Sequence, residues 1–206
     1  MAERGAFISQ EVLDASFKKR GRKQFALWID LEYCVGCNSC SMACKAENNT
    51  QVGVDYNRVI TVEEGEFTDP SKPAKDMRVY FVPMPCMHCG KPACVAACPV
   101  GAITKREEDG IVLINGDKCI GCRYCAWACP YGAPQYNADT QTMEKCTLCV
   151  HRVDKGLLPA CVTACIARTR FFGEVNDLTA LIRQKRAKEV KLSIESGTKP
   201  STMYSM

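Results

Sequence analysis

Apolar residues occur in short runs along this chain, separated by stretches rich in polar residues, glycine and proline. Each run has the length of one strand and is bounded by turn-forming residues, which predicts strands at residues 25–30, 58–62, 77–82 and 111–114. Residues 101–104 precede the turn dipeptide Asp109-Gly110, and the fourth run follows it. This arrangement predicts a β-hairpin.

A helix is predicted near the end of the chain. Leu178, Leu181 and Ile182 follow helical spacing, so we expect a helix that is capped by Asp177 and runs to about Glu189. Its outer face is basic, with Arg183, Lys185, Arg186 and Lys188. The polar tail after it, residues 196–206, is expected to become ordered only against another subunit.

The remaining polar stretches are expected to be extensions or loops. Residues 1–23 form a polar extension, and loops are expected at residues 47–50, 132–136 and 150–160. No apolar run approaches the roughly 20 residues that span a bilayer, and the first residues carry no secretory or twin-arginine pattern. A cytosolic resting place follows most simply, although export with a signal-bearing partner is compatible with the same sequence.

One cysteine group organises the chain. Cys119, Cys122 and Cys125 recur at every third position, and Cys129 follows four residues later with Pro130 after it. Three thiolates at this spacing can bind three corners of one iron–sulfur cube, while the fourth, before proline, binds the neighbouring cluster of a two-cluster ferredoxin. Gly121 allows the backbone to approach the inorganic core. This spacing is far more specific than a single CxxC pair.

Three further groups repeat the pattern and use every remaining cysteine of the 16. The first group keeps the spacing but has Lys45 in place of proline, and the second stretches the middle gap and keeps Pro99. The groups are Cys34, Cys37, Cys40 and Cys44; Cys86, Cys89, Cys94 and Cys98; and Cys146, Cys149, Cys161 and Cys165. Four thiolates to each cluster predict four [4Fe–4S] clusters.

Two structural alternatives compete with this interpretation. A disulfide framework is typical of short secreted domains with scattered cysteines, whereas twelve of these cysteines lie in tight groups. Structural zinc also uses cysteines in fours, but such sites usually join two separated CxxC knuckles. The third closely spaced cysteine followed by Cys-Pro favours iron–sulfur clusters over zinc.

Charge and motifs narrow the functional classes. The net charge of +4 is too small to argue for a nucleic-acid partner. Basic residues beside cysteines could offset cluster charge: Lys45, Lys91, Lys118, Arg123, Lys145, Arg152 and Arg168. The chain has no phosphate-binding loop, dinucleotide-binding glycine run or radical-initiating cysteine motif, so we expect no substrate chemistry and no catalytic residue. His88 and His151 are interpreted as supporting or surface residues, and Tyr124 and Trp127 are expected to pack over the clusters.

The four-group pattern resembles the four-cluster electron-transfer subunits of the dimethyl sulfoxide reductase family of molybdopterin oxidoreductases, including the polysulfide reductase type. Residues 25–173 carry the resemblance, most clearly in Cys119-Ile-Gly-Cys-Arg-Tyr-Cys and Ala-Cys129-Pro-Tyr-Gly-Ala-Pro-Gln-Tyr136. The resemblance implies that the groups pair in a nested way, the first with the fourth and the second with the third. The residues themselves support only the inner pairing, because tandem pairing of the outer groups would use the same cysteines.

Nested pairing assigns four ligand sets. They are Cys34, Cys37, Cys40 and Cys165; Cys146, Cys149, Cys161 and Cys44; Cys86, Cys89, Cys94 and Cys129; and Cys119, Cys122, Cys125 and Cys98. The implied fold is α+β, with two nested ferredoxin-like two-cluster domains. An outer domain comprises residues 24–76 and 141–173, an inner domain comprises residues 77–140, and residues 174–206 form a C-terminal helix and tail.

The resemblance also implies partners. A large catalytic subunit would carry molybdenum or tungsten on a bis-pterin cofactor, and an integral membrane anchor that reacts with quinone is a further candidate. The outer pair of clusters would face the catalytic subunit and the inner pair the membrane or an external donor. The complex would be peripheral to the cytoplasmic membrane, on a side that the sequence leaves open.

The leading functional hypothesis is therefore an electron-transfer subunit that relays single electrons through four clusters. A free polyferredoxin that serves several partners is the alternative, and a zinc-binding interaction module is a weaker one. The polar termini favour a subunit, since a free carrier needs little beyond residues 25–173.

Overall fold

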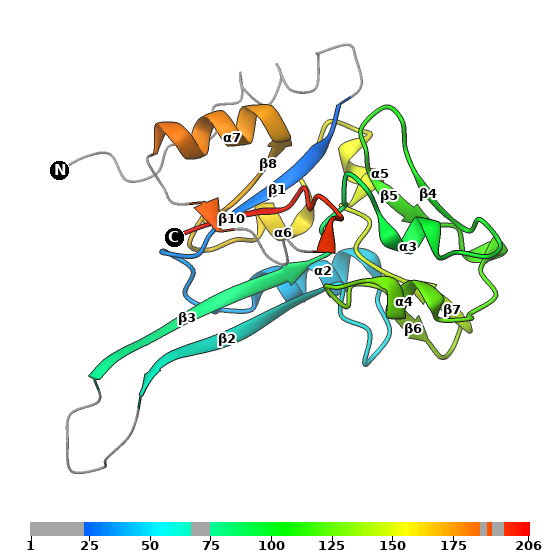
Figure 1. Ribbon diagram of the computed structural model, residues 1–206, viewed down its shortest axis with the longest axis horizontal. Helices are drawn as coiled ribbons and strands as arrows, with labels where there is room; N and C mark the ends of the chain where they lie inside the picture. Colours follow the sequence, from blue (N-terminus) through cyan, green and yellow to red (C-terminus); the bar gives the residue numbers. More distant parts are fainter. Residues whose placement is uncertain (1–22, 67–74, 186–188, 191–195) are drawn as a thin grey trace.

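The computed structural model describes residues 23–66, 75–185, 189–190 and 196–206 (Figure 1). The predicted N-terminal extension therefore lies, except for Lys23, outside the described residues. In chain order the elements are β1 (Phe25–Asp30), α2 (Ser39–Asn48), β2 (Asn57–Glu66), β3 (Lys75–Pro85), α3 (Ala93–Ala96), β4 (Ile103–Lys105), β5 (Val112–Ile114), η1 (Gly116–Lys118), α4 (Tyr124–Ala128), β6 (Gln135–Asn137), β7 (Thr142–Glu144), α5 (Val150–Val153), α6 (Ala160–Thr163), β8 (Arg170–Glu174), α7 (Val175–Gln184), β9 (Glu189–Val190) and β10 (Met203–Ser205). The mixture confirms an α+β fold.

The central sheet has the strand order β8-β1-β10-β9. β1 pairs antiparallel with β8 and parallel with β10. Both faces of β1 are covered, because Ala26 and Trp28 pack with residues of α7, while Leu27 packs in a cluster that contains Cys40 and Cys161. The continuously apolar run predicted as a strand is therefore buried on both sides, as such runs usually are.

Helix α7 covers one face of this sheet (Figure 1). Leu178 and Ile182 are buried against the sheet, as predicted. The predicted cap is wrong, because the helix starts at Val175 after an extended Glu174, and Asp177 lies inside the first turn. Lys185, expected on an outer basic face, follows the helix end and lies over the Trp28 ring, 4.9 Å from its centroid.

The C-terminal tail is part of the chain's own core, so the expectation that it orders only against another subunit is wrong. β10 lies between β1 and β9, and Met203 and Tyr204 are buried. The Tyr204 hydroxyl donates to the carbonyl oxygen of Pro83 at 2.9 Å. A polar composition concealed this role, because small hydroxyl side chains such as Ser205 fit into a crowded sheet.

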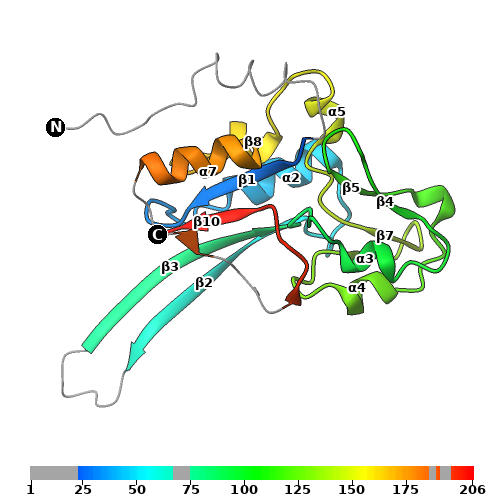
Figure 2. The same cartoon turned by 45° about the horizontal axis from the view of Figure 1, so that its top comes forward.

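Strands β2 and β3 form a long two-stranded arm that extends away from the body in both orientations (Figures 1 and 2). They pair antiparallel from Asn57 opposite Pro85 outward. Both strands were predicted, although shorter than they are. At the base of the arm the Phe81 ring lies so close to Gly36 that any side chain there would collide with it. The arm thus contacts the first cysteine loop at Gly36.

The hairpins β4-β5 and β6-β7 and the short helices α3 and α4 lie on the right of the molecule in Figure 1. The predicted hairpin is confirmed as β4 paired with β5. Tyr136, expected in a turn, lies in β6, which pairs with β7. No helix among the described residues combines the length and the apolar character needed to cross a membrane.

Two predicted loops are partly helical. Helix α2 extends through Glu47 and Asn48, which were expected in a loop, and ends at the left-handed Asn49. The stretch from Val150 onward begins with α5, and only the residues between it and Pro159 form the predicted loop. α2 begins just before Cys40 and α5 just after Cys149. The end of each cysteine loop is therefore also the start of a helix.

Candidate functional site

The first CxxC pair of each cysteine group has the same backbone turn. In these four pairs the residue before the second cysteine has a positive φ: 64° at Gly36, 39° at His88, 66° at Gly121 and 56° at Leu148. This left-handed turn reverses the chain direction between the two cysteines, so that both side chains point toward one centre. Only two of the four residues are glycine, so the geometry is imposed on His88 and Leu148 by their surroundings.

The cysteines of the first group lie beside the last cysteine of the fourth. Cys34, Cys37, Cys40 and Cys165 line one cavity, together with Arg170 and residues from the base of the arm. We name this set the Cys34 site.

The other outer cysteines form a second set. Burial raises the pKa of Cys44, and the nearby thiols of Cys146, Cys161 and Cys149 raise it further. Cys44, Cys146, Cys149 and Cys161 are named the Cys146 site.

The inner groups form the remaining two sets. Cys86, Cys89, Cys94 and Cys129 line a second cavity, the Cys86 site. Cys98, Cys119 and Cys125 pack in one cluster, and the charge of Cys122 acts on Cys125; these four are the Cys119 site. The thiols thus lie in the four nested groups that the resemblance implies, while their role as cluster ligands stays a prediction.

Donors aimed at sulfur distinguish these thiols from ordinary buried cysteines. Backbone N–H groups donate to Cys98 from Ala102 at 3.2 Å, to Cys119 from Met143 at 3.3 Å, to Cys146 from Leu148 at 3.4 Å and to Cys165 from Thr169 at 3.4 Å. Side-chain donors reach Cys40 from Asn57 at 3.2 Å, Cys44 from Asn48 at 3.6 Å and Cys161 from Arg170 at 3.6 Å. Such donors stabilise thiolate and tune the metal that it binds.

Several of the buried thiols have a raised pKa and would hold their protons without a metal. Burial raises the pKa of Cys94 and Cys146 to about 12, and that of Cys89 and Cys125 to about 11. Metal binding requires the thiolate and releases these protons. The free energy of metal ligation must therefore exceed the cost of deprotonating these buried thiols. A multinuclear centre bound by four thiolates can supply that free energy.

The spacing of the thiols fits a group larger than a single ion. Within the part of the chain that the structure describes, no three His, Cys, Asp or Glu side chains converge closely enough to hold one metal ion. At the Cys34 and Cys86 sites four cysteines line one cavity, which fits a polynuclear iron–sulfur core.

Two buried cations lie among the thiols. Lys145, singled out from the sequence, donates to the backbone carbonyl oxygens of Val112 and Cys146 and lines the cavity of the Cys86 site. Arg170 is 3% exposed and lies at the Cys34 site. Sequence reasoning missed Arg170 and its partner Asn57; the only hint was a charged residue at the start of an otherwise apolar strand.

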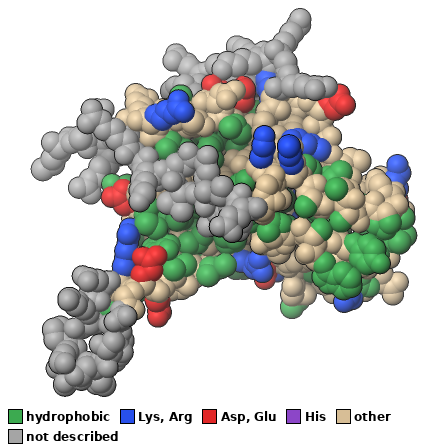
Figure 3. All heavy atoms as spheres, viewed as in Figure 1, with side chains coloured by type: hydrophobic (Ala, Val, Ile, Leu, Met, Phe, Trp, Pro, Cys, Tyr) green, Lys and Arg blue, Asp and Glu red, His purple; other side chains and the backbone are tan. Residues whose placement is uncertain are grey.

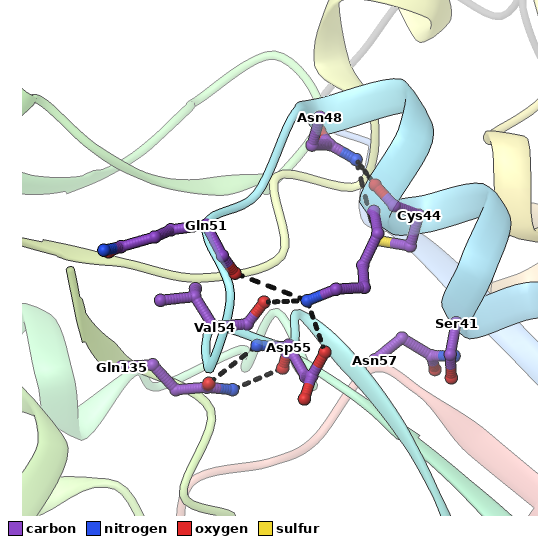
Figure 4. A network of polar contacts seen from close by, with 9 residues as sticks. Ser41, Cys44, Asn48, Gln51, Val54, Asp55, Asn57 and Gln135 are labelled. Carbon is purple, nitrogen blue, oxygen red and sulfur yellow. Dashed lines mark hydrogen bonds and ion pairs between the residues drawn. The ribbon is translucent and has the colours of Figure 1, made fainter. Parts of the chain in front are cut away.

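Lys45, which stands where a proline might follow Cys44, bonds to the loop that follows α2. Val54 and Asp55 of this loop are labelled in Figure 4. The Lys45 ammonium group donates to the carbonyl oxygen of Val54 at 3.0 Å and pairs with the Asp55 carboxylate at 2.8 Å. The backbone N–H of Asp55 donates in turn to Gln135, just after the third cysteine group. Lys45 therefore helps to join the outer and inner halves, and no proline is needed because α2 continues.

The two histidines differ in role. His88 is buried, its Nδ1 accepts a hydrogen bond from the Val112 backbone N–H, and its Nε2 has no partner among the described atoms. His151 lies at the surface, 2.8 Å from the Glu47 carboxylate. His151 thus lies at the surface, as predicted, while a supporting role for the buried His88 stays a prediction.

The expectation that Tyr124 and Trp127 pack over the clusters is wrong. Trp127 is 78% exposed, and its ring lies against the half-exposed Tyr124. Both belong to α4, whose inner side carries the buried Cys125.

The four sites lie in series. Cys40 of the Cys34 site shares an apolar cluster with Cys161 of the Cys146 site. The charge of Cys86 acts on Cys146 and links the second site to the third. Cys94 then packs with Cys98 and Cys119, which links the third site to the fourth.

Exposed apolar side chains gather at both ends of this series. At the Cys34 site they are Tyr33, Val35 and Ile166, each next to a cysteine of that site, and Ile166 is 73% exposed. At the Cys119 site they are Ile120, Tyr124 and Trp127. Figure 3 shows hydrophobic side chains gathered on the right of the molecule, over the region of α4. We name these sets the Ile166 patch and the Trp127 patch.

Comparison with known families finds two matches along the chain, and both have the same description. Residues 33–102 and residues 77–175 each match a family described as "4Fe-4S dicluster domain". The two matches overlap at residues 77–102, which contain the second cysteine group.

Comparison with curated proteins finds relatives over most of the chain, among them the B subunits of three oxidoreductases. That of the sulfite dehydrogenase of Allochromatium vinosum is 41% identical over 88% of this chain and 82% of its own length. That of the tetrathionate reductase of Salmonella typhimurium is 39% identical over 89% and 72% of the two chains. That of the selenate reductase of Mesobacillus selenatarsenatis is 38% identical over 96% and 77%.

Proposed function

Because the chain belongs to the family of iron–sulfur B subunits of sulfite, tetrathionate, selenate and dimethyl sulfoxide oxidoreductases, we propose that it relays single electrons between a large catalytic subunit and a second redox partner. The catalytic subunit would carry molybdenum or tungsten on a bis-pterin cofactor, and the second partner would be a quinone-reactive membrane subunit or another electron carrier. The chain is an electron-transfer protein that holds four [4Fe–4S] clusters.

The proposed ligands are the cysteines of the Cys34, Cys146, Cys86 and Cys119 sites. When bound, each cluster supplies a site that stores and releases one electron. The chain supplies the thiolates, the N–H donors to sulfur and the apolar packing that keeps water away from the sites. These contributions fix the potential of each site and the distance to the next.

The single observation that carries the proposal is the serial order of the sites with an exposed apolar patch at each end. A relay needs an entry and an exit, and each must come close to a partner. Apolar surface beside a terminal site is suited to burial in a protein interface. A free carrier that serves many partners would need only one such surface.

The partners are assigned from the family pattern. The Ile166 patch and the neighbouring arm are proposed to face the catalytic subunit, and the Trp127 patch the second partner. A two-stranded arm is marginally stable alone and gains from a covering surface. The interface with the catalytic subunit should exceed ~2,000 Å², as in permanent complexes. The complex would be peripheral to the cytoplasmic membrane, held there by the second partner.

A pair of charge insertions tests the two ends. Ile166→Glu places a carboxylate at the first patch and should reduce co-purification with the catalytic subunit. Trp127→Glu should leave that association intact and slow electron exchange with the second partner. Leu157→Glu, at an exposed position between α5 and α6, is the control and should change neither.

Two results would count against the proposal. If Ile166→Glu and Trp127→Glu both leave association and electron exchange unchanged, the patches are not the docking surfaces. If the native chain elutes alone and reduces several unrelated acceptors, it is a free polyferredoxin.

A further inference from the structure

We propose that Arg170, held by Asn57, is a charge bridge that raises the reduction potentials of the Cys34 and Cys146 sites together. This inference rests on the proposed function, because it concerns clusters bound at these two sites. It assigns a positioning and tuning role to two residues outside the cysteine motifs.

The geometry places Arg170 between the two sites. Its Nη2 donates to Cys161 Sγ of the Cys146 site at 3.6 Å, and its Nη1 donates to Asn57 Oδ1 at 3.3 Å. Asn57 Nδ2 donates onward to Cys40 Sγ of the Cys34 site at 3.2 Å. One guanidinium and one amide therefore connect a sulfur of each site.

The bridge is buried along its whole length. Arg170 and Asn57 are each 3% exposed, so water screens the guanidinium charge little. Among the described residues no carboxylate lies within ion-pair distance of Arg170, and its Nε has no hydrogen-bond partner. A buried cation without a counter-ion is costly. The anionic partners that make this burial tolerable are the thiolates of the two sites.

The surrounding charges agree with this reading. Burial acts to lower the pKa of Arg170, but the thiolate charges of Cys161, Cys40 and Cys165 raise it above its ordinary value. An arginine side chain stays protonated in proteins. Its charge is therefore constant over any working pH, unlike that of a histidine at the same place.

Lys145 shows how a different cation is used nearby. Its ammonium donates to two backbone carbonyl oxygens, and neither of these hydrogen bonds reaches sulfur. Arg170 donates directly to a thiol sulfur and, through Asn57, to a second site. Its planar guanidinium carries several N–H donors, so it can donate to Cys161 and to Asn57 at the same time.

A fixed positive charge favours the reduced form of a neighbouring cluster. Each reduction adds one electron from the reductant and no proton at Arg170, so the cluster becomes more negative beside an unchanged cation. Removing that cation should make both outer sites harder to reduce. The two inner sites lie beyond the Cys146 site and should respond little.

The experiment uses the full chain with its clusters assembled, titrated anaerobically with dithionite and followed by electron paramagnetic resonance. Arg170→Gln removes the charge and should shift two of the four midpoint potentials to more negative values. Arg170→Lys keeps the charge and should restore most of that shift. Arg183→Gln removes an exposed charge on α7 and should leave all four potentials in place. Cys37→Ser and Cys149→Ser identify the signals of the two outer sites.

Asn57→Ser separates the two halves of the bridge. It removes the donor to Cys40 and keeps the guanidinium, so the Cys34 site should shift and the Cys146 site should stay. If Arg170→Gln loses clusters, the potential of the Cys34 site in Asn57→Ser tests the charge bridge in its place.

The possible outcomes separate the inference from the function. If Arg170→Gln assembles all four clusters and the outer potentials are unchanged, the charge bridge is wrong and the relay stands. If Arg170→Gln loses clusters, unchanged outer potentials in Asn57→Ser have the same meaning. If Arg170→Gln and Arg170→Lys shift the midpoint potentials equally, the packing of the side chain and not its charge sets those potentials. A native chain without iron–sulfur signals would instead overturn the function.

Discussion

The Trp28 indole N–H donates to the Ser205 hydroxyl at 2.9 Å, and both residues are completely buried. This bond joins the first strand to the last, 177 positions apart. The C-terminal strand therefore closes the sheet beside the outer cluster sites. Loss of the tail should affect the fold of the chain before it affects any partner.

Tyr204→Ala tests the structural role of the tail. The ring is buried between β1 and the base of the arm, so truncation should cost roughly 3–5 kcal/mol of stability, as for other large core residues. We expect a lower melting temperature of the cluster-loaded chain under anaerobic conditions. Tyr33→Ala, at an exposed ring, is the matched control. Equal melting temperatures for the two variants would mean that the tail contributes nothing to the fold.

Gly121→Ala tests the turn inside the third cysteine group. Gly121 has φ 66°, and a Cβ there would collide with the carbonyl oxygen of Gln141. A left-handed conformation costs an alanine about 1–2 kcal/mol before any collision is counted. We expect loss of the cluster at the Cys119 site, measured as iron content and as one missing signal. Gly116→Ala has open space and should keep all four; loss in both variants would reject the steric explanation.

Cys122→Trp should convert the Cys119 site to a [3Fe–4S] cluster or empty it. Only that site is altered, and three remaining thiolates can hold three irons. Electron paramagnetic resonance of the oxidised protein should show a new three-iron signal or one lost cube, with the other three sites unchanged. Persistence of all four cubes would contradict the proposed ligand set.

Cys44→Ser distinguishes nested from tandem pairing. Cys44 lies next to Cys146, Cys149 and Cys161, so the change should disturb the Cys146 site and spare the Cys34 site. An experimental structure should place Cys44 Sγ about 2.3 Å from an iron of the cube that Cys146 also binds. A cube shared by Cys44 and Cys86 would instead establish the tandem arrangement.

The sequence was sufficient where spacing carries the chemistry. Cysteines three positions apart restrict the loop geometry so strongly that the four groups were recognised, and the Asp109-Gly110 turn located a hairpin. The pairing of distant groups is different, because nested and tandem arrangements use the same residues. The position of Cys44 beside Cys146 and that of Cys165 beside Cys34 separate them in space.

The missed features depend on contacts between segments far apart in the chain. Arg170 was not singled out from the sequence, because its role depends on Asn57, 113 positions away. Tyr124 and Trp127 were expected to pack over the clusters, yet α4 turns them outward while Cys125 turns inward. A polar tail looked like an extension because side-chain polarity does not report backbone pairing with β1.

The most direct test of the central claim is a count of iron and acid-labile sulfide in the anaerobically purified native complex, with electron paramagnetic resonance of its reduced form. Sixteen cysteines in four sets predict about sixteen iron and about sixteen sulfide per chain, in four cubes. The oxidation state of the clusters should change when the substrate of the catalytic subunit is added: a substrate that accepts electrons reoxidises reduced clusters, and one that donates electrons reduces oxidised clusters. Stoichiometric zinc in a colourless protein, or clusters whose oxidation state that substrate changes in neither direction, would contradict the four-cluster relay.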